Sequence, residues 1–275
     1  MRHMPSPLRT SRRADGSFTH WTLIGMVHLP PLPGAARSVR PLSDILKRAV
    51  VEARLLARAG FDAMIVENFG DAPFAPDAVS RETIAAMAIV VDHIARAVRI
   101  PVGVNVLRND ALSALAVAAT AGAAFIRVNV LSGTSATDQG LITGRAHELL
   151  RRRSQVAPRV RIAADVHVKH ATPVSQPDIA IAAEETAYRA GADALIVSGT
   201  GTGKPTDLDA ARRVAEAVPG HPLWIGSGVS AATVRDCLEV ATGVIVGTSL
   251  KRGGKTEGPI DPARVRRFIK AARTR

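Results

Sequence analysis

Aromatic side chains are scarce in this sequence. They make up 3% of its 275 residues, whereas hydrophobic residues as a whole make up 47%. A core of this composition is built from Ala, Val, Ile and Leu, which suits close packing of helices on strands. Proteins that bind single-stranded nucleic acid usually present aromatic rings on which the bases stack. The shortage of aromatics therefore argues against a specific nucleic-acid partner.

The sequence also lacks paired cysteines and long hydrophobic runs. Its single cysteine, Cys237, cannot form an intrachain disulfide, which fits a reducing compartment. No segment reaches the ~18 consecutive apolar residues that a membrane-spanning helix needs, and the best run, residues 84–91, stops at Asp92. The N-terminus carries no apolar segment typical of a secretory signal. We therefore expect a cytoplasmic protein without a transmembrane segment.

Positive charge is in excess and unevenly distributed. The net charge is +12, and residues 251–275 alone hold nine Lys or Arg against two acidic residues. A second cluster, Arg151–Arg153, lies in the middle of the chain. Such clusters attract phosphates, anionic lipids or nucleic acids, or they simply form a solvated surface. We favour the solvated surface and keep peripheral membrane contact as the alternative.

Short apolar runs alternate with longer segments of helical periodicity from residue 22 onward. Eight such strand–helix units in about 255 residues indicate an α/β fold, a single (β/α)8 TIM barrel. We predict one barrel domain, residues 21–275, preceded by a disordered basic tail, residues 1–20. The predicted strands are 22–28, 62–67, 101–106, 123–129, 160–167, 193–198, 222–226 and 243–247, and the helices centre on 44–59, 80–98, 109–121, 138–154, 178–190, 207–218, 230–240 and 262–273.

Polar side chains follow the predicted strands at their C-terminal ends, where the active sites of TIM barrels lie. Arg127 can bind a carboxylate or phosphate through two parallel hydrogen bonds, or it can pair with Glu67 or Asp165. Packing alone does not account for so many polar strand ends. We predict catalytic roles for two of these residues, His28 and Glu67, and substrate-binding roles for Asn68, Asn105, Arg127 and Asn129.

The stretch AADVHVKH, residues 163–170, concentrates ionisable side chains. If the strand continues, its two-residue period places Asp165, His167 and Lys169 on one inward face. These groups suit proton transfer or Schiff-base chemistry, and a salt-bridged structural cluster is the alternative. We predict that all three are catalytic. Glu67, Asp165 and His167 are also a candidate ligand set for a divalent metal ion.

Glycine-rich turns follow the last two predicted strands, in WIGSGVS and VIVGTSLK. Many TIM barrels bind a phosphate after their seventh and eighth strands, where glycines let backbone N–H groups approach the anion. Tight turns without any ligand also need glycine. We predict a phosphate site formed by Gly226, Ser227, Gly228, Gly247, Thr248, Ser249 and Lys251.

The loop SGTGTGKPT, residues 198–206, superficially resembles a nucleotide-binding P-loop. The P-loop pattern requires Gly at its first position and Ser or Thr after the Lys, where this sequence has Ser198 and Pro205. Pro205 also disfavours a helical Lys204, although a P-loop Lys opens its helix. We therefore interpret the segment as a substrate loop at the barrel mouth, with Ser198, Thr202 and Lys204 as binding residues.

The chain as a whole resembles the BtpA/SgcQ family. The resemblance rests on GMVHLPPLPG, VENFGDAPF, GVNVLRND, FIRVNV, ADVHVKH, SGTGTGKPT and GSGV…VGTSLK, which together span the sequence from about residue 22. It implies a TIM barrel. In cyanobacteria the family is associated with photosystem I biogenesis. SgcQ-like members accompany sugar-phosphate genes and carry a nucleoside-triphosphatase label.

We therefore predict an enzyme that acts on a phosphorylated sugar or nucleoside by acid–base chemistry at the barrel mouth, as an isomerase, an epimerase or an aldolase-type lyase. One alternative is a metal-assisted phosphohydrolase or nucleosidase. Another is a non-catalytic factor in the biogenesis of a membrane complex such as photosystem I. A divalent metal ion is the candidate cofactor, and we expect a homo-oligomer.

Overall fold

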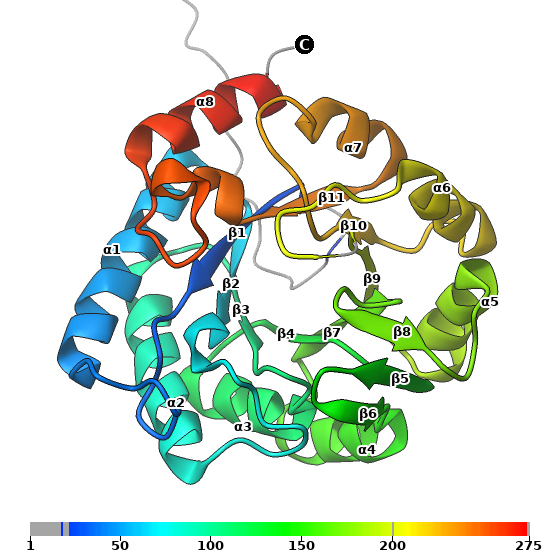
Figure 1. The fold of residues 1–275 in the computed structure, drawn as a ribbon, viewed down its shortest axis with the longest axis horizontal. Coiled ribbons are helices and arrows are strands. Elements are labelled where there is room, and N and C mark those ends of the chain that lie inside the picture. Colours follow the sequence, from blue (N-terminus) through cyan, green and yellow to red (C-terminus); the bar gives the residue numbers. More distant parts are fainter. Residues whose placement is uncertain (1–17, 19–21, 200, 274–275) are drawn as a thin grey trace, which may run out of the picture.

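The computed structural model describes residue 18 and residues 22–199 and 201–273. Eight parallel strands in this part of the chain close into a barrel, and helices surround it (Figure 1). The predicted TIM barrel is confirmed. Around the barrel the strands are β1 (Leu23–His28), β11 (Gly243–Val246), β10 (Leu223–Ile225), β9 (Ala194–Val197), β7 (Arg161–Val166), β4 (Phe125–Val128), β3 (Val102–Asn105) and β2 (Ala63–Glu67).

The outer layer consists of helices that follow the strands in chain order. Each buries an apolar stripe on the barrel, and Ser80 caps the second of them by accepting a hydrogen bond from the Thr83 N–H. The helices are α1 (Leu42–Ala59), α2 (Arg81–Ala97), α3 (Ala111–Ala121), α4 (Ala146–Val156), α5 (Ile179–Glu184), α6 (Leu208–Ala217), α7 (Val234–Val240) and α8 (Pro262–Arg273). None of the helices in the described part of the chain is long and apolar enough to cross a bilayer.

A second, three-stranded sheet lies beside the barrel (Figure 1), in the order β6 (Gly140–Thr143), β5 (Thr134–Thr137), β8 (Ala171–Pro173). The prediction of a helix from residue 138 was wrong at its start, because residues 134–143 form an antiparallel hairpin and α4 begins only at Ala146. Threonines favour extended backbone in this segment. Gly140, at a φ of 102°, closes the turn in a conformation that disfavours other residues.

The interior of the barrel is filled by side chains that point inward from the strands. Phe125 and Trp224 are the largest apolar ones, and their rings contact edge to face with centroids 5.9 Å apart. Gly103 makes room for them, because a Cβ there would lie 2.3 Å from Cζ of Phe125. Few large rings therefore suffice to fill this interior.

Phe18 completes this inner core. Its ring is buried and lies 4.8 Å from the Trp224 ring and 5.5 Å from the Phe125 ring, centroid to centroid. The predicted disordered tail, residues 1–20, otherwise lies outside the described residues, but at Phe18 the prediction was wrong.

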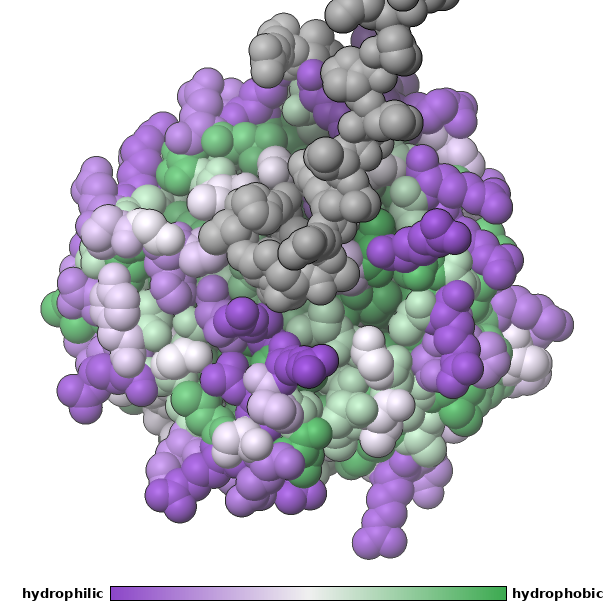
Figure 2. Space-filling model, turned by 180° about the vertical axis from the view of Figure 1, so that it is seen from behind, coloured by the Kyte–Doolittle hydropathy of each residue, from purple (hydrophilic) through white to green (hydrophobic). Residues whose placement is uncertain are grey.

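Seen from behind, hydrophilic side chains dominate the rim of the molecule, and less polar residues lie nearer its centre (Figure 2).

We expect Phe18→Ala to lower the free energy of unfolding by about 3–5 kcal/mol, because truncating a buried Phe leaves a cavity between two other rings. Urea unfolding followed by circular dichroism measures the change. The matched control is Tyr188→Ala. Because Tyr188 is 62% exposed, this substitution should change the free energy of unfolding by no more than ~0.5 kcal/mol. Equal effects of the two substitutions would contradict a packing role for Phe18.

Candidate functional site

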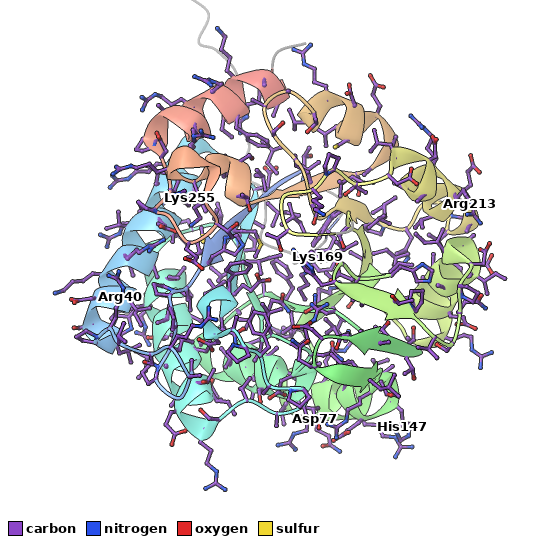
Figure 3. All side chains as sticks on the ribbon, in the orientation of Figure 1. Arg40, Asp77, His147, Lys169, Arg213 and Lys255 are labelled. Atoms are coloured by element: carbon purple, nitrogen blue, oxygen red, sulfur yellow. The ribbon has the colours of Figure 1, made fainter. Side chains whose placement is uncertain are left out.

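The mouth of the barrel contains a cavity of about 210 Å³ at the C-terminal ends of the strands. Three strands contribute ionisable side chains to it, namely His28 at the end of β1, Glu67 at the end of β2 and Arg127 in β4. Lys169, from the segment after β7, completes this group, and Figure 3 shows it near the middle of the barrel. The opposite wall is formed by the loops after β10 and β11.

Arg127 and Asp165 form a buried ion pair at the base of the mouth. The guanidinium donates from Nε to Oδ2 at 2.9 Å and from Nη2 to Oδ1 at 2.8 Å. Burial opposes the charge of Arg127, but Asp165 and Glu67 outweigh it and raise the pKa. The third nitrogen, Nη1, lies 4.0 Å from Oε2 of Glu67. The ion pair thus fixes a permanent cation against Glu67.

Two asparagines extend this network around the barrel. Asn129 donates a hydrogen bond to Oδ2 of Asp165 at 3.1 Å, and Asn105 donates to Oδ1 of Asn129 at 3.1 Å. The side chain of Asp165 is completely buried. Asp165, which we predicted to be catalytic, is therefore held by Arg127 and Asn129 and does not line the mouth cavity. Asn105 likewise holds Asn129 rather than lining the cavity.

His28 and Glu67 face each other across the ends of two adjacent strands. His28 Nε2 lies 3.8 Å from Oε1 of Glu67, and both side chains are buried. Burial lowers the pKa of His28 well below its ordinary value, and the cations Lys251, Lys169 and Arg127 lower it further. The imidazole is therefore neutral at physiological pH. It can donate or accept one proton beside the Glu67 carboxylate.

Lys169 has a lowered pKa. Burial of its ammonium is the main cause, and the charge of Arg127 adds to it, while Glu67 and Asp165 act in the opposite direction. A buried amine with a lowered pKa is the state in which lysine acts as a base or a nucleophile. Lys169, which we predicted to be catalytic, lines the same cavity as His28 and Glu67.

His167 does not lie with Asp165 and Lys169 on one inward face as predicted. β7 ends at Val166, and His167 adopts a left-handed conformation with a φ of 51°. Its Nε2 makes a hydrogen bond with the backbone carbonyl of Gln176 at 2.8 Å, away from the mouth cavity. The strand therefore turns one residue too early for the predicted alternation.

The predicted metal set of Glu67, Asp165 and His167 is wrong for the same reason. Among the described residues, no three His, Cys, Asp or Glu side chains are grouped so that they could hold a metal ion. Asp165 is bound to Arg127 instead, and His167 faces Gln176. The guanidinium of Arg127 thus lies against both Glu67 and Asp165, where the predicted site would have held a metal ion.

The glycine-rich turns after β10 and β11, for which we predicted a phosphate site, line the cavity. Gly228 has a φ of 68°, and a Cβ there would lie 2.4 Å from Cα of Pro205, so the turn packs directly on the preceding loop. The hydroxyl of Ser227 is buried and has no hydrogen-bond partner among the described residues. After β11, residues 248–250 form a 3₁₀ turn, whose first N–H groups have no partner within the turn. The lining residues are Gly226, Ser227, Gly228, Gly247, Thr248 and Ser249.

Lys251 does not belong to this phosphate site, which corrects the prediction. Its side chain is fully buried on the outside of the barrel mouth, and its ammonium donates to Oε2 of Glu52 in α1 at 2.7 Å. Glu52 also accepts hydrogen bonds from Arg48 and from the Ile260 N–H. Lys251 therefore fastens the C-terminal segment to α1.

Of the remaining residues predicted to bind substrate, one lines the cavity and three do not. Thr202 lines the cavity, where its hydroxyl meets Nε2 of His170 at 3.3 Å. Lys204 is exposed and is not among the lining residues. Ser198 donates to Asp165 at 3.4 Å, and Asn68 is buried and accepts from the Leu107 N–H at 2.7 Å. Ser198 and Asn68 therefore support the site without facing the cavity.

A larger cavity of about 550 Å³ adjoins the first, and the two share Glu67, Lys169 and Thr202. The sequence interpretation missed most of its lining. Arg108, at the end of the third strand unit, is 4% exposed and donates to the Lys169 carbonyl at 2.6 Å. The only sequence feature that pointed to Arg108 as a site residue was its position in the polar stretch VLRND. The other lining residues include Phe69, Phe74, Asp138 and His170.

We expect Lys251→Met to lower the free energy of unfolding by about 3 kcal/mol, because it leaves Glu52 buried with an incomplete set of partners. Binding of inorganic phosphate should not change. The double variant Glu52→Gln with Lys251→Met should lose less stability than the two single variants added together. Lys255→Met, at an exposed lysine of the same loop (Figure 3), is the control. A loss of phosphate affinity without a loss of stability would restore Lys251 to the phosphate site.

Comparisons with known proteins agree with this architecture. The BtpA family profile matches residues 19–274. A photosystem I biogenesis protein BtpA of Synechocystis sp. is 49% identical over 92% of this chain and 88% of its own length. An uncharacterised protein of Pyrococcus abyssi is 41% identical over 92% and 96%. An uncharacterised mitochondrial protein of Caenorhabditis elegans is 34% identical over 92% and 93%.

Solved structures share the fold at low sequence identity. N-(5′-phosphoribosyl)anthranilate isomerase of Pyrococcus furiosus superimposes with a TM-score of 0.57 at 16% identity, covering 91% of this chain and 98% of the isomerase. A native KDPGal structure gives 0.56 at 17% identity, covering 91% and 94%. These likenesses establish the barrel, whereas the sequence matches establish the relationship. The chain belongs to the BtpA family.

Proposed function

We propose that this protein is an enzyme that acts on a phosphorylated sugar or nucleoside by acid–base chemistry at the barrel mouth. One observation carries the proposal. The glycine turns suited to a phosphate and the group formed by Lys169, Glu67 and His28 line the same cavity. A substrate held at one wall would therefore present its carbon atoms to the ionisable groups at the other.

The phosphate end of the cavity would act through backbone and hydroxyl groups. Gly226 and Gly247 are confined, since a Cβ would lie 2.6 Å from a side-chain carbon of Ile196 at the first and of His28 at the second. The hydroxyl of Ser227, which has no partner among the described residues, and the first N–H groups of the 3₁₀ turn, which are not bonded within it, would be donors for an anion. The side chains of Lys169 and Arg127, which line the same cavity, would add positive charge that attracts the phosphate, so that no metal ion is needed for this purpose.

Four side chains at the reactive end of the cavity would each have a separate catalytic role. Glu67 exchanges a proton with a substrate carbon or hydroxyl, and neutral His28 does the same for an adjacent oxygen. Arg127, held by Asp165, stabilises negative charge that develops on a carbonyl oxygen. Lys169 serves as a base in an isomerase or epimerase, or attacks the carbonyl to form a Schiff base in an aldolase-type lyase. Isomerase, epimerase and aldolase-type lyase reactions are thus alternative reactions of one site.

A second candidate is a non-catalytic role in membrane-complex biogenesis, favoured by the name of the cyanobacterial relative. Relatives of comparable coverage occur in an archaeon and a nematode, neither of which builds photosystem I. Such a spread supports a small-molecule chemistry that the family shares. A metal-assisted hydrolase is less well supported, because its predicted ligands are not assembled.

Labelling with pyridoxal 5′-phosphate and borohydride tests whether the glycine turns and Lys169 act on one ligand, because this reagent combines a phosphate with an aldehyde. We expect selective labelling of Lys169, detected by peptide mass spectrometry, and protection by millimolar inorganic phosphate. Since the pKa of Lys169 is lowered, its labelling rate should level off at a pH below the value of about 10.4 at which a free lysine does so. Lys204→Met should label like the wild type, and uniform labelling of surface lysines would count against the site.

A complementation experiment separates the two candidate functions. This chain and its variants would replace the Synechocystis relative, with photosystem I content as the readout. Under the enzymatic proposal Lys169→Met abolishes complementation, whereas the exposed pair Arg266→Glu with Arg267→Glu on α8 retains it. The opposite pattern would support a docking role of the basic surface.

A further inference from the structure

The larger cavity at the mouth extends the reactive site on the side away from the glycine turns. It shares Glu67 and Lys169 with the smaller cavity, so any molecule in it meets the same reactive groups. Its volume of about 550 Å³ exceeds the 210 Å³ of the smaller cavity. A bare sugar phosphate anchored at the glycine turns would leave this second space unused.

Two of the few aromatic side chains line this space. The chain has six Phe, two Trp and one Tyr. Phe18, Phe125 and Trp224 fill the barrel interior, and Phe61 stacks on Phe268 under the outer helices. Phe69 and Phe74 instead face the larger cavity, in the segment after β2. The Phe69 ring lies 4.9 Å from the His28 ring, which connects the aromatic wall to the reactive group.

Arg108 supplies the polar side of the same space. Its side chain is 96% buried, and its one hydrogen bond to a described residue runs from Nη2 to the Lys169 carbonyl. No carboxylate of the described residues forms an ion pair with it, in contrast to Arg127. A buried guanidinium with donors left over is suited to a planar acceptor, such as the carbonyl and ring nitrogen of a heteroaromatic base.

We propose that the larger cavity binds a flat heteroaromatic ring, so that the substrate class is a nucleoside phosphate rather than a simple sugar phosphate. Phe69 and Phe74 give the ring its apolar contacts, and Arg108 donates to its edge. The sugar then lies across Glu67 and Lys169, with its phosphate at the glycine turns. This inference rests on the proposed function, because it assumes that the phosphate is bound there.

Isothermal titration calorimetry with matched probes tests this assignment. The probes are adenosine 5′-monophosphate, uridine 5′-monophosphate and ribose 5-phosphate, which differ in the ring. We expect at least one nucleotide to bind about ten-fold or more tightly than ribose 5-phosphate, in line with the contribution of one aromatic contact to a base. Phe74→Leu and Arg108→Gln should each remove most of that difference, while the affinity for ribose 5-phosphate falls less than two-fold.

The control variant is Tyr188→Leu, which removes an exposed aromatic far from the mouth. Circular dichroism and retained ribose 5-phosphate binding show that a variant is folded. If ribose 5-phosphate binds but neither nucleotide binds more tightly, the ring assignment is overturned and the proposed function stands. If neither ribose 5-phosphate nor a nucleotide binds, the phosphate site and with it the proposed function fail.

Discussion

The buried ion pair between Arg127 and Asp165 is the interaction on which the arrangement of the mouth depends. Burying two charges is favourable only if they pair with good geometry and their remaining hydrogen-bonding capacity is satisfied. Here the guanidinium and carboxylate meet through two hydrogen bonds, and Asn129 satisfies a further site on the carboxylate. The pair holds a permanent positive charge inside the barrel. That charge contributes to the lowered pKa of both Lys169 and His28.

The same ion pair separates the two ends of the barrel. Below it the interior is apolar and is closed by the rings of Phe18, Phe125 and Trp224. Above it the strand ends carry the ionisable groups, which the glycine turns and residues 202–203 of the neighbouring loop enclose. The start and the end of that loop pack closely, since a Cβ at Gly199 would lie 2.4 Å from the Pro205 carbonyl oxygen. A rigid apolar base can thus support a polar mouth assembled from loops.

The sequence predicts the barrel well because its evidence is periodic and repeated eight times. The position of the glycine turns at the mouth is predictable for a related reason, because glycines follow two strands whose places in the fold are fixed. His167 is different, because nothing in the residue types reveals that the chain adopts a left-handed conformation directly after Val166. Lys251 binds a glutamate 199 positions away, a contact that only the closed fold creates. Arg108 and Phe74 likewise come together with Lys169 only through loops from different strands.

The distribution of charge at the mouth fits the anionic substrate that we propose. Lys251 is paired with Glu52 and does not line either cavity, whereas Arg127 is paired with Asp165 but still lines the smaller cavity. Lys169 and Arg108 have no ion-pair partner among the described side chains, although both are largely buried. Burying a cation without a partner is unfavourable, and a bound anion or strong acceptor relieves that penalty. Under the proposed function, Lys169, which lines both cavities, and Arg108, which lines the larger one, would favour a ligand that is charged at one end and flat at the other.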